Sequence, residues 1–235
     1  MKTPIISKSC RVLARLLDYP GAEMRAALPG LLAVLAEEQA LTPERLAELK
    51  ALMATLQQAD TYAVEARYVE SFDRGRATSL HLFEHVHGDS RERGPAMIDL
   101  AQTYEKAGLF LGPDEMPDYL PVVLEFVSTQ PPVEARAFLG EMAHIFNAIF
   151  SALEKFDSAY ASVIGALLEI AGETAHAVKV TPDEPMDATW EEPVVFDGCS
   201  TKGQAKPGEA QPIHFVKNVA SSSNAKMALP QGVSL

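Results

Sequence analysis

Apolar residues recur at helical spacing from about residue 5 to residue 180, and this pattern limits the possible folds more than any other feature. Spacings of i, i+3, i+4 and i+7 place side chains on one face of a helix. The first such face carries Cys10, Leu13, Ala14 and Leu17. No segment alternates between apolar and polar residues as a half-buried strand does. The sequence therefore predicts an all-α protein, folded as a single helical bundle.

Capping residues, prolines and glycines between the apolar stretches predict where helices begin and end. We expect helices up to Leu17, over 22–39 with a break at Pro29-Gly30, from Thr42 as N-cap, and from Asp60 as N-cap. Further helices are expected from Pro95 to Gly108, from Asp118 as N-cap, over 133–156 as one long helix, and over 159–178.

The composition changes at Thr181-Pro182. Residues 181–235 contain six prolines and few apolar residues, with short exceptions such as 194–196 and 213–216. Such a segment cannot bury enough apolar surface to form a second domain. We predict a helical domain over 1–180 and a largely irregular, flexible tail over 181–235.

The net charge of −12 excludes several classes of function. A chain this acidic repels phosphate backbones and anionic lipid, so nucleic acid is not an expected partner and a basic partner is favoured. No apolar run is long enough for membrane insertion, and the N-terminus does not have the pattern of a secretory signal, so the expected location is cytoplasmic. Cys10 and Cys199 form no CxxC pair or other metal-binding pattern, so no bound cofactor is expected.

One short pattern indicates metal chemistry. His81, Glu84 and His85 match HxxEH, in which two histidines hold zinc and the glutamate acts as a base. The alternative is a polar helix end that happens to carry histidines, and it is favoured because a third ligand is missing, although Glu141 and His144 are imaginable. A zinc-dependent hydrolase is therefore the alternative function.

Two further segments have both structural and functional interpretations. Arg91 and Arg93 could bind a carboxylate or phosphate, or could pair with nearby acidic residues, which their spacing favours. In 114–121, Asp118 could simply cap a helix, or it could belong to an acidic lip that contacts a basic peptide.

Two blocks of the sequence resemble a known family. Residues 82–97 have the sequence LFEHVHGDSRERGPAM, and residues 116–126 have the sequence MPDYLPVVLEF. In this order and spacing, with Leu16-Leu17-Asp18-Tyr19-Pro20 near the start, they resemble the NarJ-type assembly chaperones of respiratory nitrate reductase, over about residues 5–180. Glu115-Met116-Pro117-Asp118 is similar to a Glu-x-Pro-Asp-His motif of the wider TorD-like family, with Tyr119 in place of the histidine.

The resemblance implies a TorD-like chaperone that is not an enzyme. Such proteins bind the apo form of the catalytic (alpha) subunit of nitrate reductase, at its N-terminal leader-like segment and at a second site. They enable insertion of iron–sulfur clusters and the molybdenum cofactor before membrane docking, and they are not part of the mature enzyme. A helical subunit that stays in a mature complex is a further alternative.

The same resemblance suggests where the client peptide binds. We expect a groove formed by the 84–94 loop and the start of the helix at 115–126, with an acidic rim and an apolar floor. The predicted client-binding residues are Glu84, His85, Arg91, Arg93, Glu115, Asp118, Tyr119, Val122 and Phe126.

Overall fold

The computed structural model describes residues 5–73, 75–88, 90–176 and 178. These residues belong to one compact unit, Met1–Pro185. They form ten α-helices and one short 3₁₀ helix, with no strand among them beyond an isolated bridge between His81 and Tyr119. The prediction of an all-α fold is confirmed. The predicted tail over 181–235 and Cys199 lie outside the described residues.

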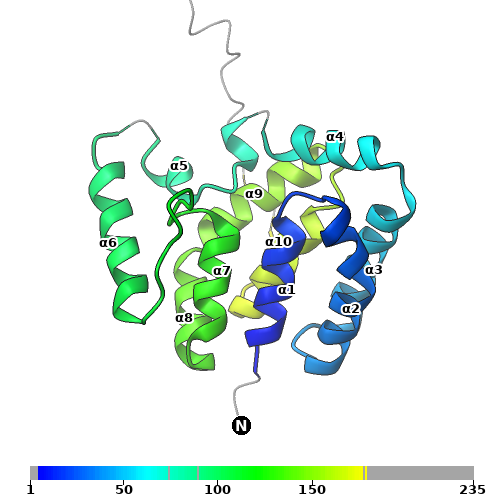
Figure 1. Ribbon diagram of the computed structural model, residues 1–235, viewed down its shortest axis with the longest axis horizontal. Coiled ribbons are helices and arrows are strands. Elements are labelled where there is room, and N and C mark those ends of the chain that lie inside the picture. The colour runs from blue at the N-terminus through cyan, green and yellow to red at the C-terminus, as the bar shows by residue number, and fades with distance from the viewer. Residues whose placement is uncertain (1–4, 74, 89, 177, 179–235) are drawn as a thin grey trace, which may run out of the picture. The chain divides into compact units, whose positions relative to one another are not determined.

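The core is built around α1 (Ser7–Leu17), α7 (Leu120–Thr129) and α10 (Ala161–Ala171). Helices α1 and α7 pack along each other, and α10 packs on α8 (Pro132–Glu141) and α9 (Ala143–Lys155) (Figure 1). Nearly every side chain of α10 is buried, because this helix is surrounded by neighbours. None of the described helices combines the length and apolarity that a membrane span requires.

Three helices cover one side of this core: α2 (Ala22–Glu38), α3 (Pro43–Gln58) and α4 (Thr61–Phe72). The N-caps predicted for α3 and α4 are both present. The Thr42 side chain accepts the backbone N–H of Arg45, and Asp60 accepts the N–H groups of Tyr62 and Ala63. These bonds satisfy donors that a helix start leaves without partners.

The corner between α3 and α4 is held by Arg25 of α2. Its guanidinium donates to the backbone carbonyls of Leu56 (2.7 Å), Gln57 (3.3 Å) and Ala59 (2.6 Å) and to the Thr61 hydroxyl (2.6 Å). The last carbonyls of a helix have no partner within the helix, and a cation beside them also complements the helix dipole. One side chain therefore fixes the end of α3 and the start of α4.

A contrasting region consists of the 3₁₀ helix η1 (Arg76–Thr78), α5 (Leu82–Val86) and α6 (Arg93–Lys106). In Figure 1, α6 stands beside the bundle at its edge. Tyr104 is the one residue of α6 that is buried. Its hydroxyl donates to the Pro117 carbonyl at 2.8 Å, and its ring lies 4.8 Å from that of Phe126. We call α5, α6 and the loop between them the arm.

Three predicted helix boundaries are wrong. Helix α2 continues through Pro29-Gly30, because both residues are exposed while Leu28 and Leu35 are buried on either side and hold the two halves on the core. The stretch 133–156 is two helices, α8 and α9, which meet at Met142.

At Met142 the backbone forms hydrogen bonds between residues three apart instead of four. The Met142 N–H donates to the Leu139 carbonyl, and the Ile145 N–H donates to the Met142 carbonyl. The change of direction allows each helix to bury its own residues, Leu139 in α8 and Phe146 in α9.

The third wrong boundary is the end of the last helix. It ends at Ala171 rather than near 178, because Gly172 adopts the left-handed conformation (φ 86°) that terminates helices.

Candidate functional site

Asp118 is at the centre of the polar contacts that join the two sequence blocks. Its side chain is fully buried, with one oxygen 3.2 Å from His81 Nδ1 and the other accepting the backbone N–H of Phe83 at 3.2 Å. Arg93 Nη2 lies 3.8 Å from the same carboxylate. A buried carboxylate is stable only with partners of this kind.

The prediction that Asp118 caps its own helix is wrong. The residue that precedes α7 is Tyr119, and no side chain caps that helix. Asp118 instead accepts an N–H from the first turn of α5, 35 positions earlier in the sequence. A carboxylate can satisfy the orphan donors of any helix start that the fold brings to it. Asp118 has no exposed surface in the described structure.

Backbone contacts hold the two blocks together at the same place. Leu82 N–H donates to the Asp118 carbonyl at 3.0 Å, and Leu120 N–H donates to the Leu80 carbonyl at 2.8 Å. These bonds flank the bridge between His81 and Tyr119, whose rings lie 5.3 Å apart. The start of α5 and the start of α7 are therefore one structural unit.

This contact raises the pKa of His81 above its usual value of 6.5. The main cause is the hydrogen bond to Asp118, which favours the imidazolium. Burial opposes the shift, and the charges of Asp118 and Glu84 reinforce it.

The two arginines of the 84–94 loop differ. Arg93 lies 3.5 Å from Glu84 and also approaches Asp118, so it braces the loop as its spacing predicted. Arg91 is exposed and forms no ion pair with the described residues. His85 faces inward, with Nε2 2.8 Å from the Ser79 carbonyl.

The histidines of the HxxEH pattern do not converge. His81 contacts Asp118, whereas His85 contacts the Ser79 carbonyl, six residues before it. His81 precedes α5 and His85 lies within it, so the pair does not share one regular helical face. Within 5–73, 75–88, 90–176 and 178, no group of three or more His, Cys, Asp or Glu side chains is placed to hold a metal ion.

A pocket of about 420 Å³ lies beside this unit, and it contains several of the predicted residues. Glu115, Tyr119 and Val122 line it, together with acidic residues that were not among the predicted client-binding residues: Asp18, Asp114 and Glu125. Asp18 belongs to the Leu-Asp-Tyr-Pro segment near the start of the chain, and that segment was the signal that could have identified it. We call this pocket the acidic pocket, because no Lys or Arg of the described chain lines it.

Phe126 lies in the core of the described structure. Its side chain is 7% exposed and packs between the rings of Tyr104 (4.8 Å) and Phe138 (5.5 Å). Of the nine predicted residues, Glu115, Tyr119 and Val122 line the acidic pocket. Glu84, His85 and Arg93 brace the neighbouring arm, Arg91 is exposed, and Asp118 and Phe126 are buried.

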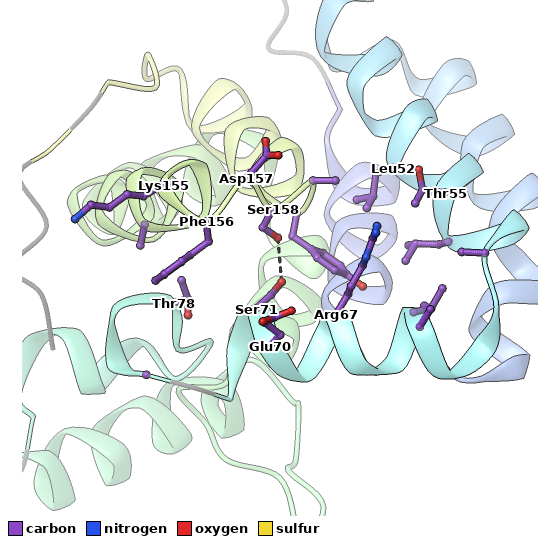
Figure 2. A pocket seen from close by; sticks show the side chains of 18 of the residues that line it. Leu52, Thr55, Arg67, Glu70, Ser71, Thr78, Lys155, Phe156, Asp157 and Ser158 are labelled. Carbon is purple, nitrogen blue, oxygen red and sulfur yellow. Dashed lines mark hydrogen bonds between the residues drawn. The ribbon is translucent and has the colours of Figure 1, made fainter. Parts of the chain in front are cut away.

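Sequence reasoning did not find a second, larger cavity of about 1030 Å³ (Figure 2). Its walls come from α3, α4, η1 and the turn between α9 and α10. We call it the trough. It is lined mainly by Leu52, Leu56, Val64, Phe156 and Tyr160, with Arg67 and Lys155 among its charged residues. Its residues are far apart in the sequence, and each apolar stripe alone is typical of a bundle core.

The helical architecture is shared with a known class of protein. A redox enzyme maturation protein from Archaeoglobus fulgidus has a similar fold, with a TM-score of 0.53 over 72% of this chain and 94% of that chain, at 20% identity. This likeness concerns the fold alone.

Sequence comparison identifies the family. The family model described as nitrate reductase delta subunit matches residues 21–164, and the chain belongs to that family. The nitrate reductase molybdenum cofactor assembly chaperone NarJ of Escherichia coli K12 is 38% identical over 191 residues, covering 77% of this chain and 81% of NarJ.

Two further relatives carry similar names. NarW of Escherichia coli K12 is 38% identical over 66% of this chain and 73% of its own length. NarJ of Bacillus subtilis is 34% identical over 66% of this chain and 84% of its own length. Both are named as probable molybdenum cofactor assembly chaperones and not as catalysts. The predicted NarJ-type assignment is confirmed, and these relatives support a chaperone that is not an enzyme.

Proposed function

We propose that this chain is the system-specific chaperone of a respiratory nitrate reductase. It binds the apo catalytic (alpha) subunit in the cytoplasm, at the N-terminal leader-like segment and at a second site. It holds that subunit open for insertion of iron–sulfur clusters and the molybdenum cofactor, and it leaves before membrane docking. Family membership supports the general role, and the acidic pocket supports the mode of binding.

The acidic pocket is the observation that carries the proposal. Four carboxylates, those of Asp18, Asp114, Glu115 and Glu125, surround Tyr119 and the half-buried Val122. A basic, amphipathic peptide presents the complementary combination of cations and apolar side chains. Asp18 is half-buried and paired with Arg15 at 2.8 Å, whereas Asp114, Glu115 and Glu125 are exposed. The attraction of these exposed carboxylates for cations is screened by solvent and weakens as salt is added.

Calorimetry with the N-terminal peptide of the catalytic subunit tests this assignment. The double variant Glu115→Gln, Glu125→Gln removes two charges from the pocket. The amide introduced at position 115 keeps an oxygen that can accept the Gly112 N–H, which Glu115 accepts at 2.7 Å. We expect affinity for the peptide to fall by about tenfold or more, equivalent to ~1.4 kcal/mol, and its salt dependence to weaken.

A matched control is Glu105→Gln, Glu141→Gln, which removes two exposed charges outside the pocket. If both double variants weaken binding equally, the effect reflects net charge and the acidic pocket is not the site. Equal affinity of the pocket variant and the unmodified chain at low salt would have the same meaning.

The maturation role needs its own experiment. The catalytic subunit is produced with and without this chain, and its iron and molybdenum contents are measured. We expect both metals to be depleted when the chain is absent. Fractionation of the assembled, membrane-bound reductase tests the alternative of a permanent subunit, since a chaperone will be missing from the mature enzyme and present in the soluble fraction.

A further inference from the structure

The trough lies between α3, α4, η1 and the turn that joins α9 to α10. Its side on α3 is formed by Leu52, Thr55 and Leu56, which share one face of the helix, and by Ala59, which follows the helix end. Its side on α4 includes Ala63, Val64, Arg67 and Ser71 at helical spacing. Val64 and Ser71 are buried in the wall of the trough, whereas Ala63 and Arg67 on the same helix are exposed.

The trough is lined by one buried polar group that the described residues do not satisfy. Tyr160 is 3% exposed and lines the cavity, and its hydroxyl has no hydrogen-bond partner among the described residues. A buried hydroxyl without a partner is unfavourable, so a ligand that hydrogen-bonds to it gains affinity. Beside it, Ser71 and Ser158 share a hydrogen bond of 3.0 Å between α4 and the α9–α10 turn (Figure 2).

The trough is lined by two cations and two carboxylates, whereas no Lys or Arg lines the acidic pocket. Arg67 and Lys155 line the trough and are exposed, and neither forms an ion pair with a described residue. Two acidic residues, Glu70 and Asp157, also line the trough. Glu70 interacts with another part of the chain, and the Asp157 side chain is exposed. In Figure 2 the Arg67 side chain extends from α4 toward the opposite walls of the trough, on which Leu52 and Ser158 lie. Unpaired cations beside an apolar wall suit a carboxylate on an apolar helix.

We propose that the trough binds a second segment of the client, an amphipathic helix that carries a carboxylate among its apolar residues. This inference rests on the proposed chaperone function and adds the location and chemistry of the second site. The helix lies along α3 and α4 with its apolar face on the exposed side chains of Ala63 and Phe156. Its carboxylate meets Arg67 and the Tyr160 hydroxyl. The acidic pocket thus takes a cationic segment, and the trough takes an apolar segment whose carboxylate pairs with Arg67.

The test uses the full chain and the apo catalytic subunit lacking its leader segment. Ala63→Trp fills the trough from an exposed position of α4, and Ala66→Trp adds the same bulk to the same helix outside the trough. We expect Ala63→Trp and Arg67→Glu each to weaken binding of the leaderless subunit by about tenfold or more. Ala66→Trp should leave it unchanged, and all three variants should bind the leader peptide as the unmodified chain does.

Several outcomes overturn the inference. If the leaderless subunit binds the unmodified chain and Ala63→Trp alike, the trough is not its site. If no form of the subunit binds the unmodified chain, the proposed function itself fails. Loss of leader-peptide binding in Ala63→Trp alone would place the leader, and not a second segment, in the trough.

The chemistry of the occupant is tested separately. A photo-cross-linking amino acid at position 63, with position 66 as control, should capture peptides from the catalytic subunit that are amphipathic and acidic. Captured peptides that are basic would contradict the charge assignment. A cross-link to a second copy of the chain, or to residues 179–235 when the client is absent, would assign the trough to that occupant instead.

Discussion

The core around α10 and the arm that contains α6 are stabilised in different ways. Leu167 and Leu168 of α10 are fully buried among apolar neighbours, whereas α6 is tied down by one buried tyrosine. The arm is also held by the contacts of Asp118 with His81, Phe83 and Arg93. The comparison indicates that the core determines whether the chain folds, and that a few polar and aromatic contacts determine how the arm and the acidic pocket are arranged.

The largest effect is expected where the core is truncated. Leu167→Ala removes a side chain with no exposed surface, and both the lost apolar burial and the resulting cavity are unfavourable. We expect the free energy of unfolding to fall by about 2–5 kcal/mol, measured by urea denaturation. The matched change Leu100→Ala, at a half-buried position of α6, should have a much smaller effect. Equal losses would contradict the distinction between core and arm.

A smaller effect is expected at the buried carboxylate. Asp118→Ala leaves the Phe83 N–H without its acceptor and removes the partner of His81. We expect a loss of about 1–3 kcal/mol, since a buried group is left unsatisfied. Asp118→Asn keeps an acceptor and should lose less. If Asp118→Ala melts at the same temperature as the unmodified chain, Asp118 does not secure the arm.

Removal of one hydroxyl sharpens the comparison further. Tyr104→Phe keeps the ring contact with Phe126 but deletes the bond to the Pro117 carbonyl. We expect a loss of about 0.5–1.5 kcal/mol. Hydrogen exchange should accelerate in α6 and remain unchanged in α10. Acceleration in both helices would show that the arm and the core open together.

The smallest effect is a pH dependence at His81. Because its folded-state pKa is raised above 6.5, its contribution to stability is complete below pH 6.5 and is lost as the pH rises through the folded pKa. The stability difference between the unmodified chain and His81→Gln should therefore shrink as the pH increases from about 6 to about 8. A difference that is constant across this range would show that His81 gains no proton affinity on folding.

The sequence predicted the core better than it predicted the site. Helical periodicity identified the buried stripes of α1, α3 and α10, because burial of apolar side chains leaves a local pattern. The break at Met142 could not be predicted in this way, since the stripe continues through it and the change of direction depends on how α8 and α9 each pack.

The site depended on contacts between distant residues. The spacing of Asp118 suits an N-cap of the next helix, whereas the fold supplies a different helix start that needs an acceptor. The trough was missed for a similar reason. The apolar spacing of α3 does not reveal whether another helix covers it.

The corner held by Arg25 has a consequence for the speed and strength of binding. The end of α3 and the start of α4 are fixed by four hydrogen bonds from one guanidinium, and both helices form the trough next to that corner. A receptor whose walls are ordered before the encounter loses little conformational entropy on association. The ordering cost then falls almost wholly on the incoming segment, so segments that are already helical in solution should bind the trough tightest.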